Sequence, residues 1–126
     1  MRRWFIRGRR DDDSLGRGLW RRLHDDCSTA LREAPERAEL LPRVRSCCEQ
    51  AQRNWPTDSL DVPADPAGLA AYGHLQAVRR ALREAAYRDR LSQAGPLGAD
   101  GGGPQQVRLR EQAVRTARDL LVAGPT

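Results

Sequence analysis

Apolar residues recur at spacings of three and four along four segments of the chain, which is the repeat of an amphipathic helix. The first predicted helix covers residues 14–34, after an acidic triplet at 11–13 that suits the positive end of a helix dipole. Gly16 and Gly18 weaken its first turn, and Pro35 ends it. Its apolar stripe is Leu15, Leu19, Leu23, Cys27, Ala30, Leu31 and Ala34.

A second helix is predicted over residues 42–54, because Pro42 fits a first turn, where the missing N–H costs no hydrogen bond. Its inner side holds Val44, Cys47, Cys48, Ala51 and Trp55. A third helix is predicted over 66–93, with Asp65 as the N-cap and Pro66 as the first residue. Its stripe is Leu69, Tyr72, Leu75, Val78, Leu82 and Ala86.

A glycine-rich linker at residues 94–104 separates the third helix from a fourth, predicted over 105–123. The inner residues of the fourth helix are Val107, Ala113 or Val114, Ala117, Leu120 and Leu121. No segment alternates apolar and polar residues as a strand does. The pattern predicts an all-α fold, an antiparallel bundle of about four helices. One domain spans 11–126, after a basic N-terminal arm at 1–10.

The basic residues change how the composition is interpreted. All 22 are Arg and none is Lys. Arg codons can be GC-rich, so this bias predicts a high-GC genome, of the bacterial kind, before it predicts guanidinium chemistry. Residues 1–10 hold five Arg and no acid, whereas the rest of the chain holds seventeen Arg and seventeen acids. The formal charge of +5 therefore belongs to the arm, and a neutral body argues against wrapping nucleic acid over a broad face.

The arm also contains an aromatic and aliphatic cluster, Trp4-Phe5-Ile6. Arginines with Trp and Phe suit an anionic membrane surface, and they also suit phosphate contacts with base stacking. The cluster can equally dock on a protein partner, or pack as a staple at the entrance to the first helix. The candidate partner- or membrane-binding residues are Arg2, Arg3, Trp4, Phe5, Ile6, Arg7, Arg9 and Arg10.

Five arginines lie mostly off the apolar stripe of the third helix, with only Glu84 and Asp89 to oppose them. We call them the arginine ridge, a candidate surface for an anionic partner and by default a solvated face. Its members are Arg79, Arg80, Arg83, Arg88 and Arg90.

Cys27 and Cys47 are predicted to lie at nearly the same level of a helical hairpin, with Cys48 and His24 close by. A metal or thiol-switch cluster is one reading, but neighbouring residues on a helix point about 100° apart and no CxxC occurs. Small residues filling a helix interface are the simpler reading. We predict no metal and no cofactor.

No catalytic constellation is visible. Asp25 and Asp26 adjoin His24, but side chains one or two apart on a helix are expected to point apart. His74 is expected to be solvated or at the edge of the core. The Gly101-Gly102-Gly103 run lacks the Lys and Ser or Thr of a phosphate loop, so it is assigned to the linker.

The function expected from these features is that of a non-enzymatic helical adaptor or regulator, docking to a protein partner or an anionic membrane through its arm. Nucleic-acid binding by the arm and the arginine ridge is an alternative, as is a thiol- or metal-responsive regulator. Self-association is also expected, with Trp20, Trp55 and Tyr87 marking an interface if exposed. No small-molecule substrate is inferred. No segment reaches the roughly 18 apolar residues of a membrane span, so a cytoplasmic protein is expected, at the inner face of the membrane if the arm binds lipid.

Overall fold

The computed structural model describes residues 13–94 and 102–124. Within these ranges it contains one short 3₁₀ turn, four α-helices and no strand, which confirms the all-α prediction. The elements are η1 (Asp13–Leu15), α2 (Leu19–Ala30), α3 (Arg37–Asn54), α4 (Pro66–Gln93) and α5 (Gly102–Ala123).

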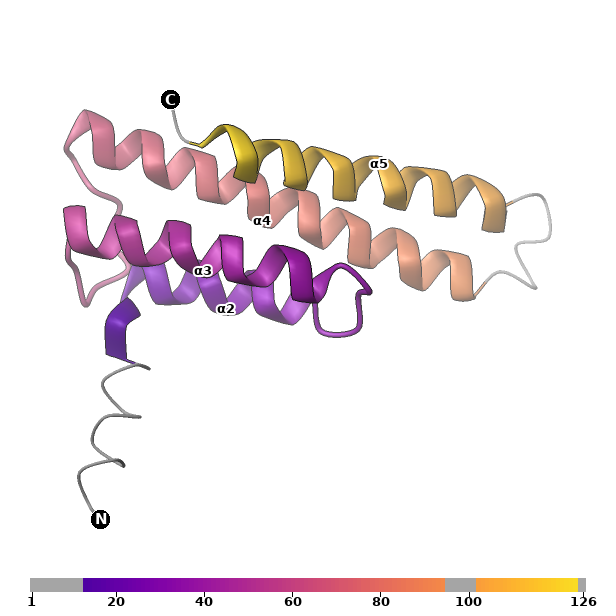
Figure 1. The fold of residues 1–126 in the computed structure, drawn as a ribbon, viewed down its shortest axis with the longest axis horizontal. Helices are drawn as coiled ribbons and strands as arrows, with labels where there is room; N and C mark the ends of the chain where they lie inside the picture. Colours follow the sequence, from indigo (N-terminus) through magenta and orange to yellow (C-terminus); the bar gives the residue numbers. More distant parts are fainter. Residues whose placement is uncertain (1–12, 95–101, 125–126) are drawn as a thin grey trace, which may run out of the picture.

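The helices form a bundle made of two pairs (Figure 1). The long helices α4 and α5 pack along most of their lengths, and α2 and α3 form a shorter pair against them. The connection at residues 31–36 lies at one end of the bundle, and the connection at 55–65 lies at the other. None of the described helices is both long enough and apolar enough to cross a bilayer.

The core lies between the two pairs and is built mainly from Leu, Val, Ala and Cys. Leu23 of α2, Leu40 of α3 and Leu75 of α4 are all buried, and Ala117 comes from α5. On α2 the predicted stripe is confirmed from Leu15 to Leu31, with its two alanines only half-buried. Full burial of a leucine contributes roughly 1.5–3 kcal/mol, so this shared core is what holds the four helices together.

The first helix begins five residues later than predicted. Gly16 has a φ of +69°, a left-handed conformation that breaks the helix between η1 and α2. Gly18 is the N-cap of α2, and the N–H of Leu19 donates to the carbonyl oxygen of Ser59 at 2.8 Å. The two glycines therefore end one element and begin the next, and Leu15 reaches the core from η1 instead.

The second helix begins five residues earlier than predicted, at Arg37, and Pro42 lies inside it. The ring of Pro42 leaves the carbonyl of Ala38 without its usual helical donor. The earlier start is nevertheless favoured because it brings Leu40 into the core, where it is fully buried. Packing has outweighed the local preference of proline for a first turn.

The third helix matches its prediction at both ends. Asp65 is the N-cap, and its side chain accepts a hydrogen bond from the N–H of Gly68 at 3.0 Å. The fourth helix begins three residues earlier than predicted, so Gly102 and Gly103 belong to its first turn and not to a linker. Pro104 follows them, and an early position suits a residue without an N–H.

Two residues predicted to face the core, Leu69 and Val107, are exposed, and Trp20, whose exposure was left open, is buried. Trp20 is fully buried, and its indole N–H donates to the carbonyl oxygen of Trp55 at 2.9 Å. Leu69 is 51% exposed and Val107 is 43% exposed. The buried stripe of α4 runs through Gly68, Ala71, Leu75, Val78, Leu82 and Ala85. Leu69 lies one residue, or about 100° of rotation, away from that stripe.

Two ion pairs connect α5 to the start of α3. Arg110 donates to both carboxylate oxygens of Glu36, at 2.5 and 3.3 Å. Arg118 does the same to Glu39, at 2.6 and 2.8 Å. These forked contacts help to fix the register of α5 against the other helix pair, because two parallel N–H···O bonds constrain the relative placement of guanidinium and carboxylate.

Candidate functional site

The basic arm at residues 1–10 lies outside the described residues. The described chain begins at Asp13, in η1, beside the α3–α4 connection: a Cβ on Gly16 would lie 3.3 Å from the carbonyl oxygen of Thr57. The root of the arm is therefore at the end of the bundle where residues 55–65 lie (Figure 1).

Much of the arginine ridge is paired with acids. Arg79 and Arg83 both reach Asp26 of α2, at 2.7 and 3.2 Å, and Arg79 also donates to Gln76. The carboxylate of Asp26 was missed as a partner because nothing in the sequence places α2 beside α4. These two arginines join α4 to α2 and share one carboxylate, so the surface charge of the pair is smaller than the sequence suggests.

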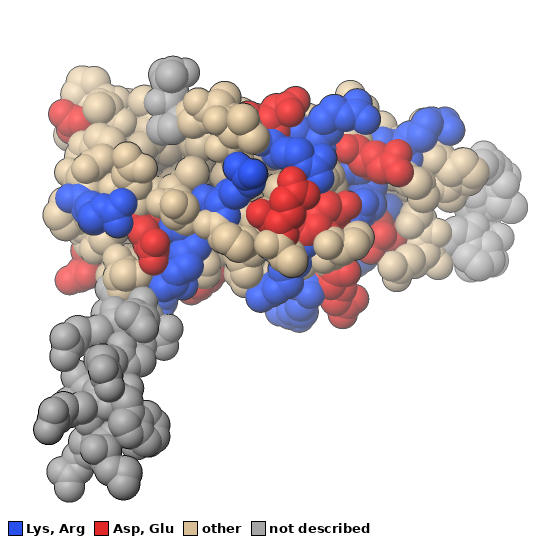
Figure 2. Space-filling model, viewed as in Figure 1, with Lys and Arg blue, Asp and Glu red and all other residues tan. Residues whose placement is uncertain are grey.

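The remaining members of the arginine ridge differ from one another. Arg88 contacts Glu84 at 2.5 Å and Gln106 at 3.1 Å, and its guanidinium lies 5.4 Å from the ring centre of Tyr87. Arg80 and Arg90 are exposed. On the face shown in Figure 2, positive and negative side chains are interspersed and form no single basic surface. This face thus lacks the continuous basic stripe that backbone contacts to nucleic acid need.

The cysteines form part of the helix interface. Cys27 and Cys48 are buried and Cys47 is half-buried, and all three are free thiols. Burial raises the pKa of Cys27 to about 12, despite the opposing influence of Arg79. Burial also raises the pKa of Cys48, with a further contribution from Cys27, so it is Cys48 that lies near Cys27. A raised pKa keeps a thiol protonated at neutral pH, which lowers its reactivity.

Within the described ranges, no three side chains of His, Cys, Asp or Glu are grouped as a metal site would require. His74 lies at the core edge, where its Nε2 donates to the carbonyl oxygen of Leu120 at 2.6 Å, since a carbonyl can only accept. This contact places the first third of α4 level with the last turn of α5.

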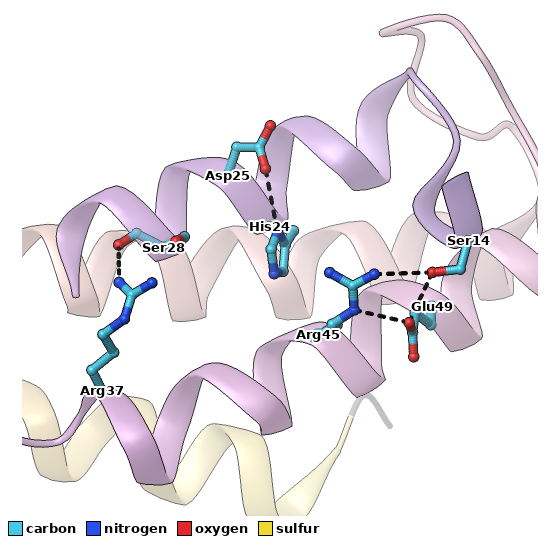
Figure 3. A network of polar contacts seen from close by, with 7 residues as sticks. All are labelled: Ser14, His24, Asp25, Ser28, Arg37, Arg45 and Glu49. Carbon is cyan, nitrogen blue, oxygen red and sulfur yellow. Dashed lines mark hydrogen bonds and ion pairs between the residues drawn. The ribbon is translucent and has the colours of Figure 1, made fainter. Parts of the chain in front are cut away.

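His24 and Asp25 do not point apart as expected. Nδ1 of His24 and Oδ1 of Asp25 are 3.2 Å apart, and His24 is 8% exposed. Its ring points from α2 toward α3 and lies between Arg37 and Arg45 (Figure 3). A hollow of about 700 Å³, which we call the α2–α3 hollow, opens beside this group of side chains. The sequence signal for it was the adjacent His-Asp pair.

Three large apolar side chains are exposed in the α3–α4 connection and in the first turn of α4. We call this set the apolar end: Leu60, Val62 and Leu69, at 53%, 42% and 51% exposed. Val122 of α5 is 66% exposed as well. Leu60 and Val62 belong to the connection, Leu69 lies in the first turn of α4, and Val122 lies in the last turn of α5. Two lone apolar residues in a polar loop were the only sequence signal for this surface.

The loop beside the apolar end is acidic. Residues 56–65 contain three Asp and no Arg, and Asp58 and Asp61 are exposed. The carboxylate of Asp65 is held by the indole N–H of Trp55 at 3.0 Å, in addition to its capping bond. Exposed carboxylates and exposed apolar side chains thus alternate along this loop.

Comparison of the chain with protein-family models, with curated proteins and with solved structures found no match.

Proposed function

We propose that this chain is a non-enzymatic adaptor that docks to a protein partner through its apolar end together with the basic arm. The observation that carries the proposal is the exposure of Leu60, Val62 and Leu69 in the α3–α4 connection and the first turn of α4. Large exposed apolar side chains that gather in one region mark interaction surfaces. The arm starts at this same end, so both features reach one partner. We take the scaffold to be an antiparallel bundle, which suits the connections at its opposite ends.

The charge at the apolar end favours a protein over an anionic membrane. Asp58 and Asp61 are exposed beside Leu60 and Val62. A bilayer with anionic headgroups repels carboxylates at its surface. A protein partner can instead offer an apolar patch edged by both signs of charge, which matches the acidic loop and the basic arm at once.

The test uses affinity capture by the full chain, followed by a binding measurement with the purified candidate. The variant Leu60→Asp/Val62→Asp places two more carboxylates at the apolar end. Val107→Asp is the matched control, because Val107 is an exposed valine on the opposite half of α5. We expect a partner that is retained by wild type and control and whose affinity for the double variant falls at least tenfold, with a weaker partner signal when residues 2–10 are deleted.

Two outcomes would overturn the proposal. One is that every captured protein is retained equally by the double variant. The other is binding of the wild-type chain to vesicles of anionic lipid, or salt-sensitive binding to duplex DNA, in the absence of a variant-dependent partner. Those results would reassign the arm to a membrane or to nucleic acid.

A further inference from the structure

The α2–α3 hollow is at the opposite end of α2 and α3 from the exposed loop, and it has a mixed lining. Its apolar wall comes from the connection and the start of α3, where Pro35, Ala38 and Leu41 face it. Its polar groups are His24 of α2 and Arg37 and Arg45 of α3. A volume of about 700 Å³ lies within the usual range of small-molecule sites, roughly 300–1,000 Å³.

His24 offers this hollow an unused hydrogen-bonding atom. A carboxylate only accepts, so Nδ1 carries the proton that is shared with Asp25 at 3.2 Å. In the uncharged form of the ring Nε2 is then an acceptor, and no atom of the described residues is its hydrogen-bond partner. The side chain is 11% exposed and its ring is directed toward α3 (Figure 3). Every buried side-chain N or O atom of the described residues has a hydrogen-bond partner, so Nε2, which has none, is an accessible atom of a residue that lines the hollow.

The two arginines on either side of His24 differ in their hydrogen-bond and ion-pair partners. Arg45 is held by Glu49 at 3.0 Å and by the hydroxyl oxygen of Ser14 at 3.2 Å (Figure 3). Arg37 donates one bond, to the carbonyl oxygen of Ser28 at 3.2 Å, and forms no ion pair with an acid of the described ranges. Arg37 therefore brings an uncompensated positive charge and spare N–H donors to the hollow.

We propose that the α2–α3 hollow binds a small organic carboxylate that also carries a hydroxyl group. The carboxylate pairs with the guanidinium of Arg37, which matches its geometry. The hydroxyl donates to Nε2 of His24, and Asp25 keeps the ring in the tautomer that accepts. The apolar body of the ligand rests on Pro35, Ala38 and Leu41. This ligand offers an acceptor to Arg37, a donor to His24 and an apolar surface to the wall of the hollow. The proposal is independent of the adaptor function.

The experiment is an NMR titration of the ¹⁵N-labelled full chain with 2-, 3- and 4-hydroxybenzoate. The three isomers place the hydroxyl at three distances from the carboxylate. Two matched compounds follow for the best isomer: its amide, which lacks the charge, and benzoate, which lacks the hydroxyl. We expect saturable shifts at residues 24–28 and 34–42, and binding at least tenfold tighter than that of either matched compound.

The decisive variant is Arg37→Gln, and Arg43→Gln is its control, because Arg43 is an exposed arginine of the same helix outside the hollow. We expect at least a tenfold loss of affinity for Arg37→Gln and less than a twofold change for the control. His24→Phe, with its fold checked by the same spectra, should remove the preference over benzoate.

Three results would overturn the proposal. The first is no saturable shift for any isomer up to roughly 10 mM, well above the about 1 mM that marks very weak binding. The second is an equal loss in Arg37→Gln and Arg43→Gln, which would indicate general attraction of an anion by the chain. The third is saturable binding whose shifts lie along the arginine ridge instead.

Discussion

Buried polar atoms show how single residues are placed in this bundle. Trp20 was expected beside the stripe of α2, yet it is fully buried. Its N–H is satisfied by the carbonyl oxygen of Trp55, and the two rings lie 6.4 Å apart at a tilted angle. A buried indole N–H without a partner would be strongly unfavourable. The partner comes from the far end of α3, so sequence periodicity on α2 alone gave no reason to place Trp20 inside.

Thiol accessibility gives a residue-scale prediction. Burial raises the pKa of all three cysteines, and Cys47 is the least buried of them. The thiolate is the reactive form, so Cys47 should react first with an aromatic disulfide reagent at neutral pH, and Cys27 and Cys48 only at the rate of local opening.

The measurement is the number of protein thiols that have reacted as a function of time, in buffer and in denaturant. The variant Cys47→Ser should lose the fast phase and keep the slow one, and all remaining thiols should react at once when the chain is unfolded. A fast phase that persists in Cys47→Ser would contradict the burial pattern and revive a thiol-responsive role for Cys27 or Cys48.

At the scale of elements, two glycines with opposite surroundings test why α2 begins where it does. A Cβ at Gly18 would lie 2.3 Å from the carbonyl oxygen of Ser59 and 2.6 Å from the backbone of Asp58. A Cβ at Gly73, inside α4, would meet nothing within 4 Å. The first glycine permits a close backbone approach, and the second only weakens a helix.

We therefore expect Gly18→Ala to destabilise the protein by about 1–3 kcal/mol, because backbone must move apart. Gly73→Ala should stabilise it by about 0.5–1 kcal/mol, since alanine restricts the unfolded chain and favours the helix. Urea unfolding followed by circular dichroism measures both. Equal effects of the two substitutions would mean that the contact between Gly18 and the α3–α4 connection is not maintained in solution.

At the scale of the whole molecule, acid sensitivity should follow from the carboxylates that join elements. The hydrogen bond from Arg118 lowers the pKa of Glu39. Burial opposes the charged form of Glu49, but hydrogen bonds from Ser14 and Arg45 outweigh it and lower its pKa as well. Glu39 connects α3 to α5, and Glu49 connects α3 to η1.

A carboxyl whose pKa is lower in the folded state contributes stability that is present above its unfolded pKa, ordinarily near 4.5. That contribution is lost as the pH falls through the lower, folded value. We expect wild type to be more stable than Glu39→Gln/Glu49→Gln at pH 7, and the difference to shrink on acidification below pH 4.5. Thermal unfolding from pH 7 to pH 3 measures it. A difference that is independent of pH would show that the carboxylate charges contribute nothing.

The positions of the four helices could be predicted from the sequence. The predicted ends were most accurate where a capping residue is chemically specific. Asp65 and Pro66 set the start of α4 because a carboxylate acceptor and a residue without an N–H suit those two positions alone. Pro42 led to a wrong predicted start for α3, because the burial of Leu40 outweighs the local preference of proline for a first turn. The arm, a candidate site taken from composition, lies outside the described residues and stays a prediction.

The sequence by itself determined the helical character of the chain, the stripe of α2 and the confinement of the net charge to ten residues, because each depends on neighbours along the chain. Only the tertiary structure decided the partners of the charged groups. Asp26 holds Arg79 across two helices, and Arg37 is left without an acid of the described ranges. It also turned His24 toward α3, because these relations depend on which helices pack together.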